Sequence, residues 1–149
     1  MTFDSLQIII PVYNEGENIA KTLGEIEDKI ATSHTLLIVY DFDEDNTIPV
    51  VQDIARQRPA TRVSLVKNHY GKGVLNAIRT GFDSTNDGVV LVAMADSSDD
   101  LSVVDSMFEK INQGYDIVCG SRYIKGGKQI GGPIIRDCSQ ELLESLCTS

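Results

Sequence analysis

Acidic side chains stand just past two apolar runs of the chain. Asp96 follows the run Val89–Met94, and Asp41 and Asp43 follow Leu36–Tyr40. Carboxylates bind hard divalent cations, and they are strong acceptors for N–H and O–H groups. If both runs are strands of one parallel sheet, their carboxyl ends meet at the edge where such sheets bind ligands. The pattern therefore predicts a polar ligand site, with a cation where the ligand is anionic.

The residues around Asp96 offer further ligands for such a cation. Ser98, Asp99 or Asp100 could supply further ligands directly or through water, because Mg²⁺ readily keeps water molecules. The alternative interpretation is structural: Asp99, Asp100 and Ser102 would cap the next helix and interact favourably with its dipole. The sequence leaves both interpretations open.

A second polar group follows the first apolar run of the chain, residues 8–12. We expect a strand there and then a helix that Asn14 caps through its side-chain oxygen, with Glu17 reaching back to the Asn14 amide. The loop between them would lie at the ligand edge of the sheet. The residues placed on this loop are Pro11, Tyr13 and Glu15.

The glycine-rich stretch Gly71-Lys72-Gly73 lacks the spacing of a phosphate-binding P-loop. Its glycines permit a turn into the next helix, and Lys72 could offset the charge of a diphosphate. A solvated lysine is the alternative. His34 and His69 have no partner at metal-ligand spacing, so we interpret both as structural or exposed.

Strand and helix patterns alternate along the chain, which indicates an α/β fold with a mainly parallel sheet. In the third helix the apolar residues Val74, Leu75, Ile78 and Phe82 are expected to form the buried face. The expected strands lie near residues 8–12, 36–40, 63–66, 89–94 and 115–119, and the expected helices near residues 19–30, 49–55, 74–82 and 103–111.

In order and spacing these motifs, together with Gly120-Ser121-Arg122-Tyr123, resemble the nucleotide-binding half of family 2 glycosyltransferases. Within that family the set looks most like the dolichyl- or polyprenyl-phosphate mannose or glucose synthases. The resemblance implies a Rossmann-like GT-A domain over residues 1–133, followed by a divergent tail over 134–149. Family members continue further, so we expect this chain to be truncated after the nucleotide-binding half.

The resemblance also implies roles for the acidic residues. Asp96 would be a metal-binding and catalytic residue, although the family usually has Asp-x-Asp and this chain has Met94-Ala95-Asp96. Ser98 and Asp99 would be the further metal ligands. Asp41 or Asp43 would accept a hydrogen bond from the nucleotide base. The implied cofactor is Mg²⁺ or Mn²⁺.

The remaining roles concern the donor nucleotide and its sugar. Pro11 and Tyr13 would hold the base and ribose, and Glu15 would accept from a ribose hydroxyl. Lys72 would lie near the diphosphate, and Arg122 would face the sugar or its phosphate in catalysis. The implied activity is transfer of a hexose from a GDP- or UDP-sugar to a polyprenyl phosphate.

Two alternatives to this activity follow from the same residues. Asp41 and Asp43 look superficially like the Asp-x-Asp signature of haloacid-dehalogenase-type phosphatases, with Asp41 as nucleophile and Asp43 as acid/base. The short tail also makes a nucleotide-binding remnant without turnover credible. A phosphatase would hydrolyse an aryl phosphate, whereas a remnant would bind nucleotide and consume nothing.

Composition limits the partners and the compartment. The chain has 149 residues and a formal net charge of −9, which argues against a nucleic-acid backbone as partner. No apolar run is long enough to span a bilayer, and no signal peptide is visible. Three cysteines without metal spacing indicate reduced thiols. We expect a cytoplasmic protein that acts at the cytoplasmic membrane surface. We also expect it to self-associate through Leu142, Leu143 and Leu146.

Overall fold

The computed structural model describes residues 2–121. Met1 and residues 122–149 lie outside the described part, and with them Arg122 and the three leucines of the tail. The chain divides into two compact units between residues 117 and 118. All the elements below belong to the first unit.

The strands of the described residues form one parallel sheet in the order β3-β2-β1-β4. Its two central strands align over their whole length, because Ser5 lies opposite Ser33 and Val12 lies opposite Tyr40. The short edge strand β4 pairs only with the first half of β1, from Leu6 to Ile9. The bounds are Ser5–Val12 for β1, Ser33–Tyr40 for β2, Val63–Lys67 for β3 and Val89–Val92 for β4.

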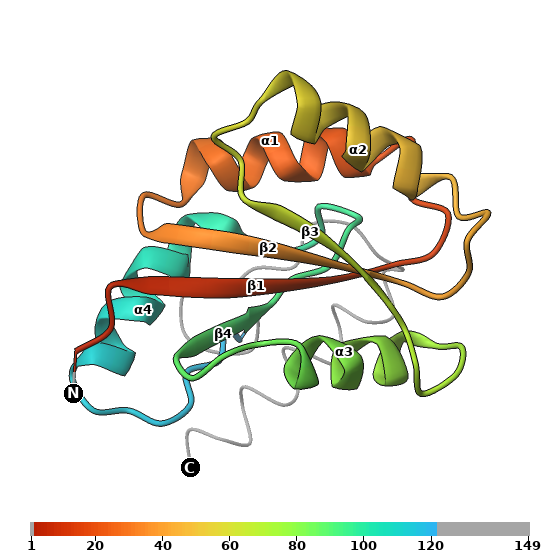
Figure 1. Ribbon diagram of the computed structural model, residues 1–149. Helices are drawn as coiled ribbons and strands as arrows, with labels where there is room; N and C mark the ends of the chain where they lie inside the picture. The colour runs from red at the N-terminus through yellow and green to blue at the C-terminus, as the bar shows by residue number, and fades with distance from the viewer. Residues whose placement is uncertain (1, 122–149) are drawn as a thin grey trace, which may run out of the picture. The chain divides into compact units, whose positions relative to one another are not determined.

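Helices cover both faces of this sheet. Figure 1 shows α1 and α2 side by side above the sheet and α3 below it. The bounds are Ile19–Lys29 for α1, Thr47–Gln57 for α2, Val74–Asp83 for α3 and Val104–Asn112 for α4, which a short 3-10 helix, Leu101–Val103, precedes. None of the helices within residues 2–121 has the length and apolar character needed to cross a membrane.

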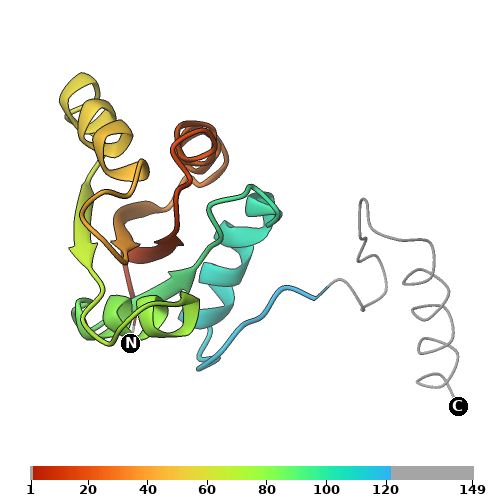
Figure 2. The ribbon, with the colours of Figure 1, turned by 90° about the vertical axis from the view of Figure 1, so that its right-hand side faces the viewer.

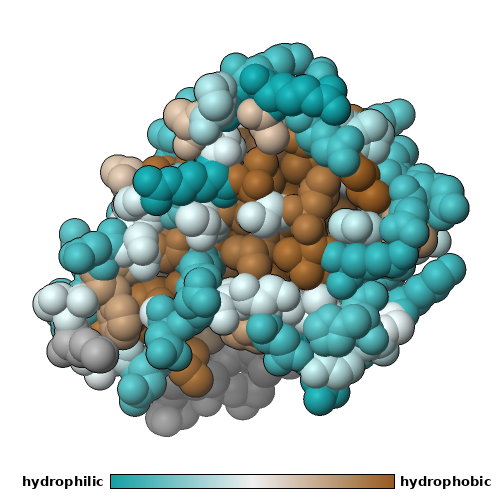
Figure 3. Space-filling view, in the orientation of Figure 1, coloured by the Kyte–Doolittle hydropathy of each residue, from teal (hydrophilic) through white to brown (hydrophobic). Residues whose placement is uncertain are grey.

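Two apolar cores separate the layers, because successive side chains of a strand point to opposite faces. Ile8 and Ile10 of β1 belong to the larger core, which also contains Leu23 of α1 and Val104 of α4. Ile9 points the other way, into a smaller core with Ala77 of α3. Figure 3 shows apolar side chains between the α1–α2 layer and the sheet. Partly buried residues, among them Ile54 and Leu65, pack against the larger core.

The third helix packs on the sheet through a different face from the one expected. Ala77, Thr80 and Gly81 are its buried residues, whereas Leu75 is 76% and Phe82 50% exposed. A β-carbon on Gly81 would lie 2.5 Å from Cγ2 of Ile9. Small residues therefore face the sheet because the helix approaches it so closely, and the prediction from apolar spacing was wrong.

Three local predictions also need correction. Residues 115–119 form no strand. Pro11 is not a loop residue: it is buried within β1, opposite Val39 and past the last residue that pairs with β4, so its missing N–H interrupts no bond to that neighbour. Asn14 does not cap α1, because the N-cap residue is Asn18 and no side chain caps it.

Candidate functional site

The four parallel strands of the described residues have their carboxyl ends at one edge of the sheet. In Figure 2 this edge faces the viewer. From β1 the chain moves to β2 and β3 on one side and returns to β4 on the other side of β1. Parallel sheets bind ligands at such a change of direction, outside the carboxyl ends of the strands. The loops at this edge carry all the site residues predicted within residues 13–99.

The loop after β1 is tied to the start of α2 by hydrogen bonds. The Asn14 amide donates to Oδ2 of Asp45 at 3.0 Å, and the Glu15 amide donates to Oγ1 of Thr47 at 2.9 Å. Asp45 is only 1% exposed, and its other oxygen accepts from the Thr47 amide at 2.8 Å. This buried carboxylate therefore fixes the loop that bears Tyr13 and Glu15.

Asn46 extends this connection by one residue. Its Oδ1 accepts from the Gly16 amide at 2.8 Å, and its own amide donates to Oδ1 of Asn14 at 3.4 Å. Asn14 adopts a φ of 55°, a left-handed conformation that asparagine tolerates better than most residues. The Asn14 side chain that was expected to cap α1 is thus used to join two loops.

An aromatic side chain that the sequence analysis left out connects two predicted residues. The ring of Phe42 contacts that of Tyr13 edge to face, with centroids 5.4 Å apart, and Nζ of Lys72 lies 5.7 Å from the Phe42 centroid. Tyr13 is 60% exposed, so its ring is available to a ligand. Edge-on aromatic pairs and a nearby cation are both favourable contacts. The structure therefore brings Tyr13 and Lys72 to the same place.

The two acidic residues after β2 have different partners. Oδ1 of Asp41 accepts from Nδ2 of Asn68 at 2.7 Å, and Oδ2 accepts from the Gly73 amide at 2.9 Å. Asp43 instead forms an exposed ion pair with Nζ of Lys67 at 2.6 Å, and this hydrogen bond raises the pKa of Lys67. Asp41 is oriented by its neighbours, whereas Asp43 is held by one surface lysine.

The loop after β4 is organised by its own carboxylates. Asp96 is exposed, and its Oδ1 accepts from the Ser98 amide at 3.0 Å. Hydrogen bonds from the Ser98 side chain and backbone hold the pKa of Asp96 below its usual value, so its carboxylate is ionised at neutral pH. The carboxylate of Asp99 accepts from the Met94 amide at 2.9 Å, which folds the loop back on itself.

The capping alternative holds for Asp100 and not for Asp99. Oδ1 of Asp100 accepts from the Ser102 amide at 3.1 Å and from the Ser102 hydroxyl at 2.6 Å, and it is the N-cap of the 3-10 helix. Asp99 makes no such contact and is used within the loop. Asp99 therefore does not cap the helix, in contrast to Asp100.

Thr22 of α1 connects the β4 loop to the rest of the domain, and sequence reasoning missed it. Its hydroxyl donates to the Ala95 carbonyl at 2.7 Å and lies 3.2 Å from the hydroxyl of Ser97, which has a φ of 56°. Thr22 is 1% exposed. A threonine on the apolar face of a helix, beside Leu23, was the available signal, because a buried hydroxyl needs a partner.

A divalent cation is compatible with this loop if the ligand contributes to its coordination. Within residues 2–121, no three histidine, cysteine, aspartate or glutamate side chains gather closely enough to hold a metal ion. Mg²⁺ is commonly bound through one or two carboxylates together with phosphate oxygens and water. An exposed, ionised Asp96 fits that mode, with Ser98 adjacent.

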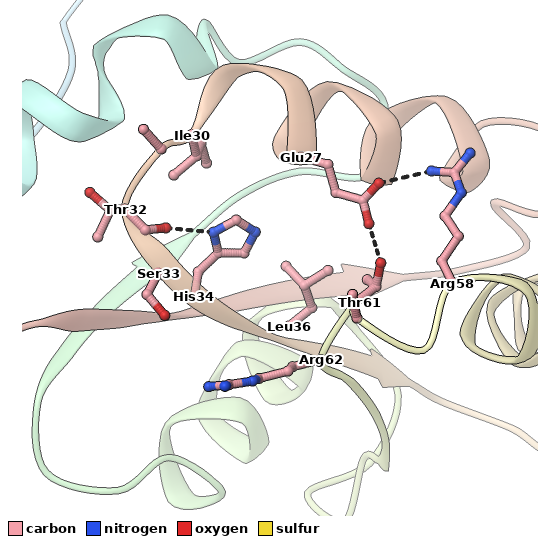
Figure 4. A pocket seen from close by; sticks show the side chains of 11 residues that line it. Glu27, Ile30, Thr32, Ser33, His34, Leu36, Arg58, Thr61 and Arg62 are labelled. Atoms are coloured by element: carbon pink, nitrogen blue, oxygen red, sulfur yellow. Dashed lines mark hydrogen bonds and ion pairs between the residues drawn. The ribbon is translucent and has the colours of Figure 1, made fainter.

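The predicted roles of the histidines agree with the geometry. Nδ1 of His34 lies 2.7 Å from the carbonyl of Thr32, and Nε2 of His69 lies 3.6 Å from a carboxylate oxygen of Asp83. His34 also borders the pocket of Figure 4, about 510 Å³ in volume. This pocket is lined by the end of α1, the start of β2 and the segment before β3, so it is separate from the candidate site.

Comparison with known proteins agrees with the fold and the order of the motifs. Residues 7–135 match the family model described as glycosyl transferase family 2. The chain belongs to this family. It is 31% identical over 132 residues to a dolichol-phosphate mannosyltransferase of Pyrococcus furiosus, covering 88% of this chain and 37% of that protein. The match to an undecaprenyl-phosphate mannosyltransferase of Micrococcus luteus is 33% identical over 131 residues, and covers 86% and 52%.

A solved structure supports the fold. The mannosyltransferase PcManGT of Pyrobaculum calidifontis, in complex with GDP-Man and Mn²⁺, superimposes with a TM-score of 0.56 at 22% identity, over 64% of this chain and 28% of that chain. The domain is thus an α/β domain of the GT-A type, as expected. The chain spans about a third to a half of the length of these curated relatives. The phosphatase alternative has no support, because the matched family is one of glycosyl transferases.

Proposed function

We propose that this chain carries the donor-binding half of a glycosyltransferase that moves a hexose from a GDP- or UDP-sugar to a polyprenyl phosphate. The observation that carries the proposal is the set of side chains gathered at the carboxyl edge of the sheet. There an oriented Asp41 and an exposed, ionised Asp96 follow two different strands, and Phe42 contacts both Tyr13 and Lys72. A nucleoside diphosphate needs hydrogen-bond acceptors for the N–H groups of its base, and positive charge to offset the negative charge of its diphosphate.

The residues after β1 and β2 suit the nucleoside. A carboxylate fixed through both oxygens can still accept, because each oxygen has a second lone pair, so Asp41 can receive a base N–H. Tyr13 and Phe42 offer aromatic surface to the base. The carboxylate of Glu15 accepts from Nδ2 of Asn18 at 2.9 Å, and a ribose hydroxyl can donate to it as well.

The residues after β4 suit the diphosphate and its cation. Mg²⁺ or Mn²⁺ bound at Asp96, with Ser98 and Asp99 supporting it directly or through water, would offset the charge that develops on the leaving diphosphate. Lys72 would supply a further positive charge near the diphosphate, and Arg122, outside the described residues, is assigned to the sugar or its phosphate. The relative from Pyrobaculum carries GDP-Man with Mn²⁺, which favours this assignment.

The acceptor follows from the relatives and from the chemistry of the site. Their names specify dolichol phosphate and undecaprenyl phosphate. A phosphate acceptor is already ionised and needs little help from a general base, in keeping with histidines that make other contacts. Such an acceptor would place the protein at the cytoplasmic membrane surface. Self-association through Leu142, Leu143 and Leu146 stays a prediction, because these residues lie outside the described part of the chain.

A thermal-shift panel tests the proposal. The full chain is melted with UDP, GDP, CDP and their sugars, each with and without Mn²⁺. A ligand at 100 times its dissociation constant stabilises the fold by about 2.7 kcal/mol, so we expect a clear shift for one nucleotide that increases with Mn²⁺. Absence of any nucleotide shift would overturn the proposal. Release of free nucleotide when a polyprenyl phosphate is added would separate a transferase from a remnant that only binds.

A further inference from the structure

Asn68, at the end of β3, joins two parts of the candidate site. Its side chain is 9% exposed. Nδ2 donates to Oδ1 of Asp41 and to the Gly71 carbonyl, both at 2.7 Å. Oδ1 accepts from the Tyr70 amide at 3.1 Å and from the Thr80 hydroxyl at 2.9 Å. An asparagine amide can donate two hydrogen bonds and accept two, so every bond that this side chain can make is used.

These four partners permit only one orientation of the amide. If oxygen and nitrogen were exchanged, the oxygen would face the Asp41 carboxylate and the Gly71 carbonyl, neither of which can donate. The NH₂ group would then face the Tyr70 N–H. Buried polar groups without partners cost about 1–3 kcal/mol each, so the orientation is fixed by the surroundings.

The second oxygen of Asp41 completes a closed connection around Lys72. It accepts from the Gly73 amide at 2.9 Å, while Asn68 binds the Gly71 carbonyl on the other side of the lysine. Gly71 and Gly73 have φ values of 93° and 119°, which side-chain-bearing residues rarely adopt. The backbone on both sides of Lys72 is thus held by the Asp41–Asn68 pair.

We propose that Asn68 is a positioning residue that makes Asp41 and the Lys72 loop one unit. This inference rests on the proposed function, in which Asp41 contacts the base and Lys72 the diphosphate. Asn68 touches neither part of the ligand. It sets the direction of the Asp41 carboxylate and the backbone of residues 71–73, so both ends of a nucleoside diphosphate depend on it.

The test is the variant Asn68→Asp in the full chain. Aspartate keeps the acceptors for Tyr70 and Thr80 but removes both donated bonds, and it sets a second carboxylate against Asp41. The dissociation constants of GDP and UDP, each with Mn²⁺, are measured by calorimetry. We expect about a tenfold weakening for the nucleotide that the parent binds, since hydrogen bonds to a charged group are lost.

Thr80→Val is the matched control. It removes the hydroxyl that donates to Asn68 and leaves the bonds to Asp41 and Gly71 in place, in the same buried network. We expect a lower unfolding temperature for this variant with nearly unchanged nucleotide affinity. In the double variant Asp41→Asn/Asn68→Asp, the amide introduced at position 41 can donate to the carboxylate introduced at position 68 and still accept from Gly73. This variant should therefore bind inorganic diphosphate with Mn²⁺, measured by the same calorimetry, more tightly than Asn68→Asp does.

The outcomes separate this inference from the proposed function. If the parent binds a nucleotide and Asn68→Asp binds it equally well, the positioning role is wrong and the function stands. If Thr80→Val weakens binding as much as Asn68→Asp, Asn68 only stabilises the fold and the inference is again overturned. If the parent binds neither nucleotide, the proposed function fails and the inference fails with it.

Discussion

The loops after β2 and β4 each present a carboxylate at the same edge of the sheet, but they hold it differently. Asp41 is bound by Asn68 and Gly73, which are 27 and 32 residues further along the chain. Asp96 is bound by Ser98, two residues away. The proposed nucleoside end is therefore built by tertiary contacts, whereas the proposed cation end is built by a local turn.

This difference has consequences for binding. A site held by long-range hydrogen bonds is already ordered before the ligand arrives, so less conformational entropy is lost on binding. The β4 loop depends on its own turn and on the contact of Thr22 with Ala95 and Ser97. We therefore expect nucleoside binding to be sensitive to the fold of the domain, and cation binding to be sensitive mainly to Asp96 itself.

The largest effect is expected at Asp45, on the nucleoside side. Asp45→Ala leaves the buried Thr47 amide and the part-buried Asn14 amide without their acceptor. The free energy of unfolding should therefore fall by about 3 kcal/mol, and nucleotide binding should be lost with the loop. Urea denaturation and calorimetry measure the two quantities. The control is Asp45→Asn, which keeps one acceptor oxygen and should lose about half as much stability. Parent-like nucleotide binding by Asp45→Ala would contradict the role of this loop.

Asp96 provides the converse experiment on the cation side. We expect Asp96→Asn to abolish the part of the nucleotide-induced thermal shift that depends on Mn²⁺, because the carboxylate proposed to bind the cation is removed. The unfolding temperature in the absence of ligand should not change. Thermal shifts with GDP or UDP, with and without Mn²⁺, measure this. Asp100→Asn, in the same loop, is the control and should keep its Mn²⁺ dependence. An unaltered Mn²⁺ response in Asp96→Asn would show that the cation binds elsewhere.

A smaller effect is expected at Asp105 of α4, which makes a long-range connection away from the site. It accepts from the Thr32 hydroxyl at 2.7 Å and from the amides of Ala31 and Thr32, and these bonds hold its pKa below its usual value. A carboxyl whose pKa is lower in the folded state stabilises the fold above its unfolded pKa, and loses this contribution as the pH falls through the folded value.

The expected result for Asp105→Asn is a loss of about 1 kcal/mol at pH 7, a shallower decline of stability as the pH falls below the usual pKa range of an aspartate, and unchanged nucleotide affinity. Denaturation curves across that pH range, with calorimetry at pH 7, measure both. If Asp105→Asn lowered nucleotide affinity as well as stability, a loss of stability far from the site would also weaken binding. The dependence of binding on the fold would then not be specific to the nucleoside side.

Much of the fold was predictable because its signals are local. Apolar runs and helical periodicity gave four strands and four helices in the right order, and the position of Asp41 and Asp96 just past strands placed both at the ligand edge. The buried face of α3 was predicted wrongly because its packing depends on the distance to Ile9, which favours small residues over large ones. Residues 115–119 are apolar enough for a strand but pair with none of the strands in residues 2–121.

By itself the sequence determined which residue types reach the edge of the sheet, since strand ends and polar residues are adjacent in the chain. Only the tertiary structure decided what those residues bind. Asn14 bonds to Asn46 instead of capping α1, Phe42 contacts both Tyr13 and Lys72, and Asn68 closes the connection between Asp41 and Gly71. The reason is physical. Apart from the short-range bond between Asn68 and Gly71, these contacts join residues 27 to 32 positions apart in the chain, and their geometry is fixed by strand register, which no local pattern records.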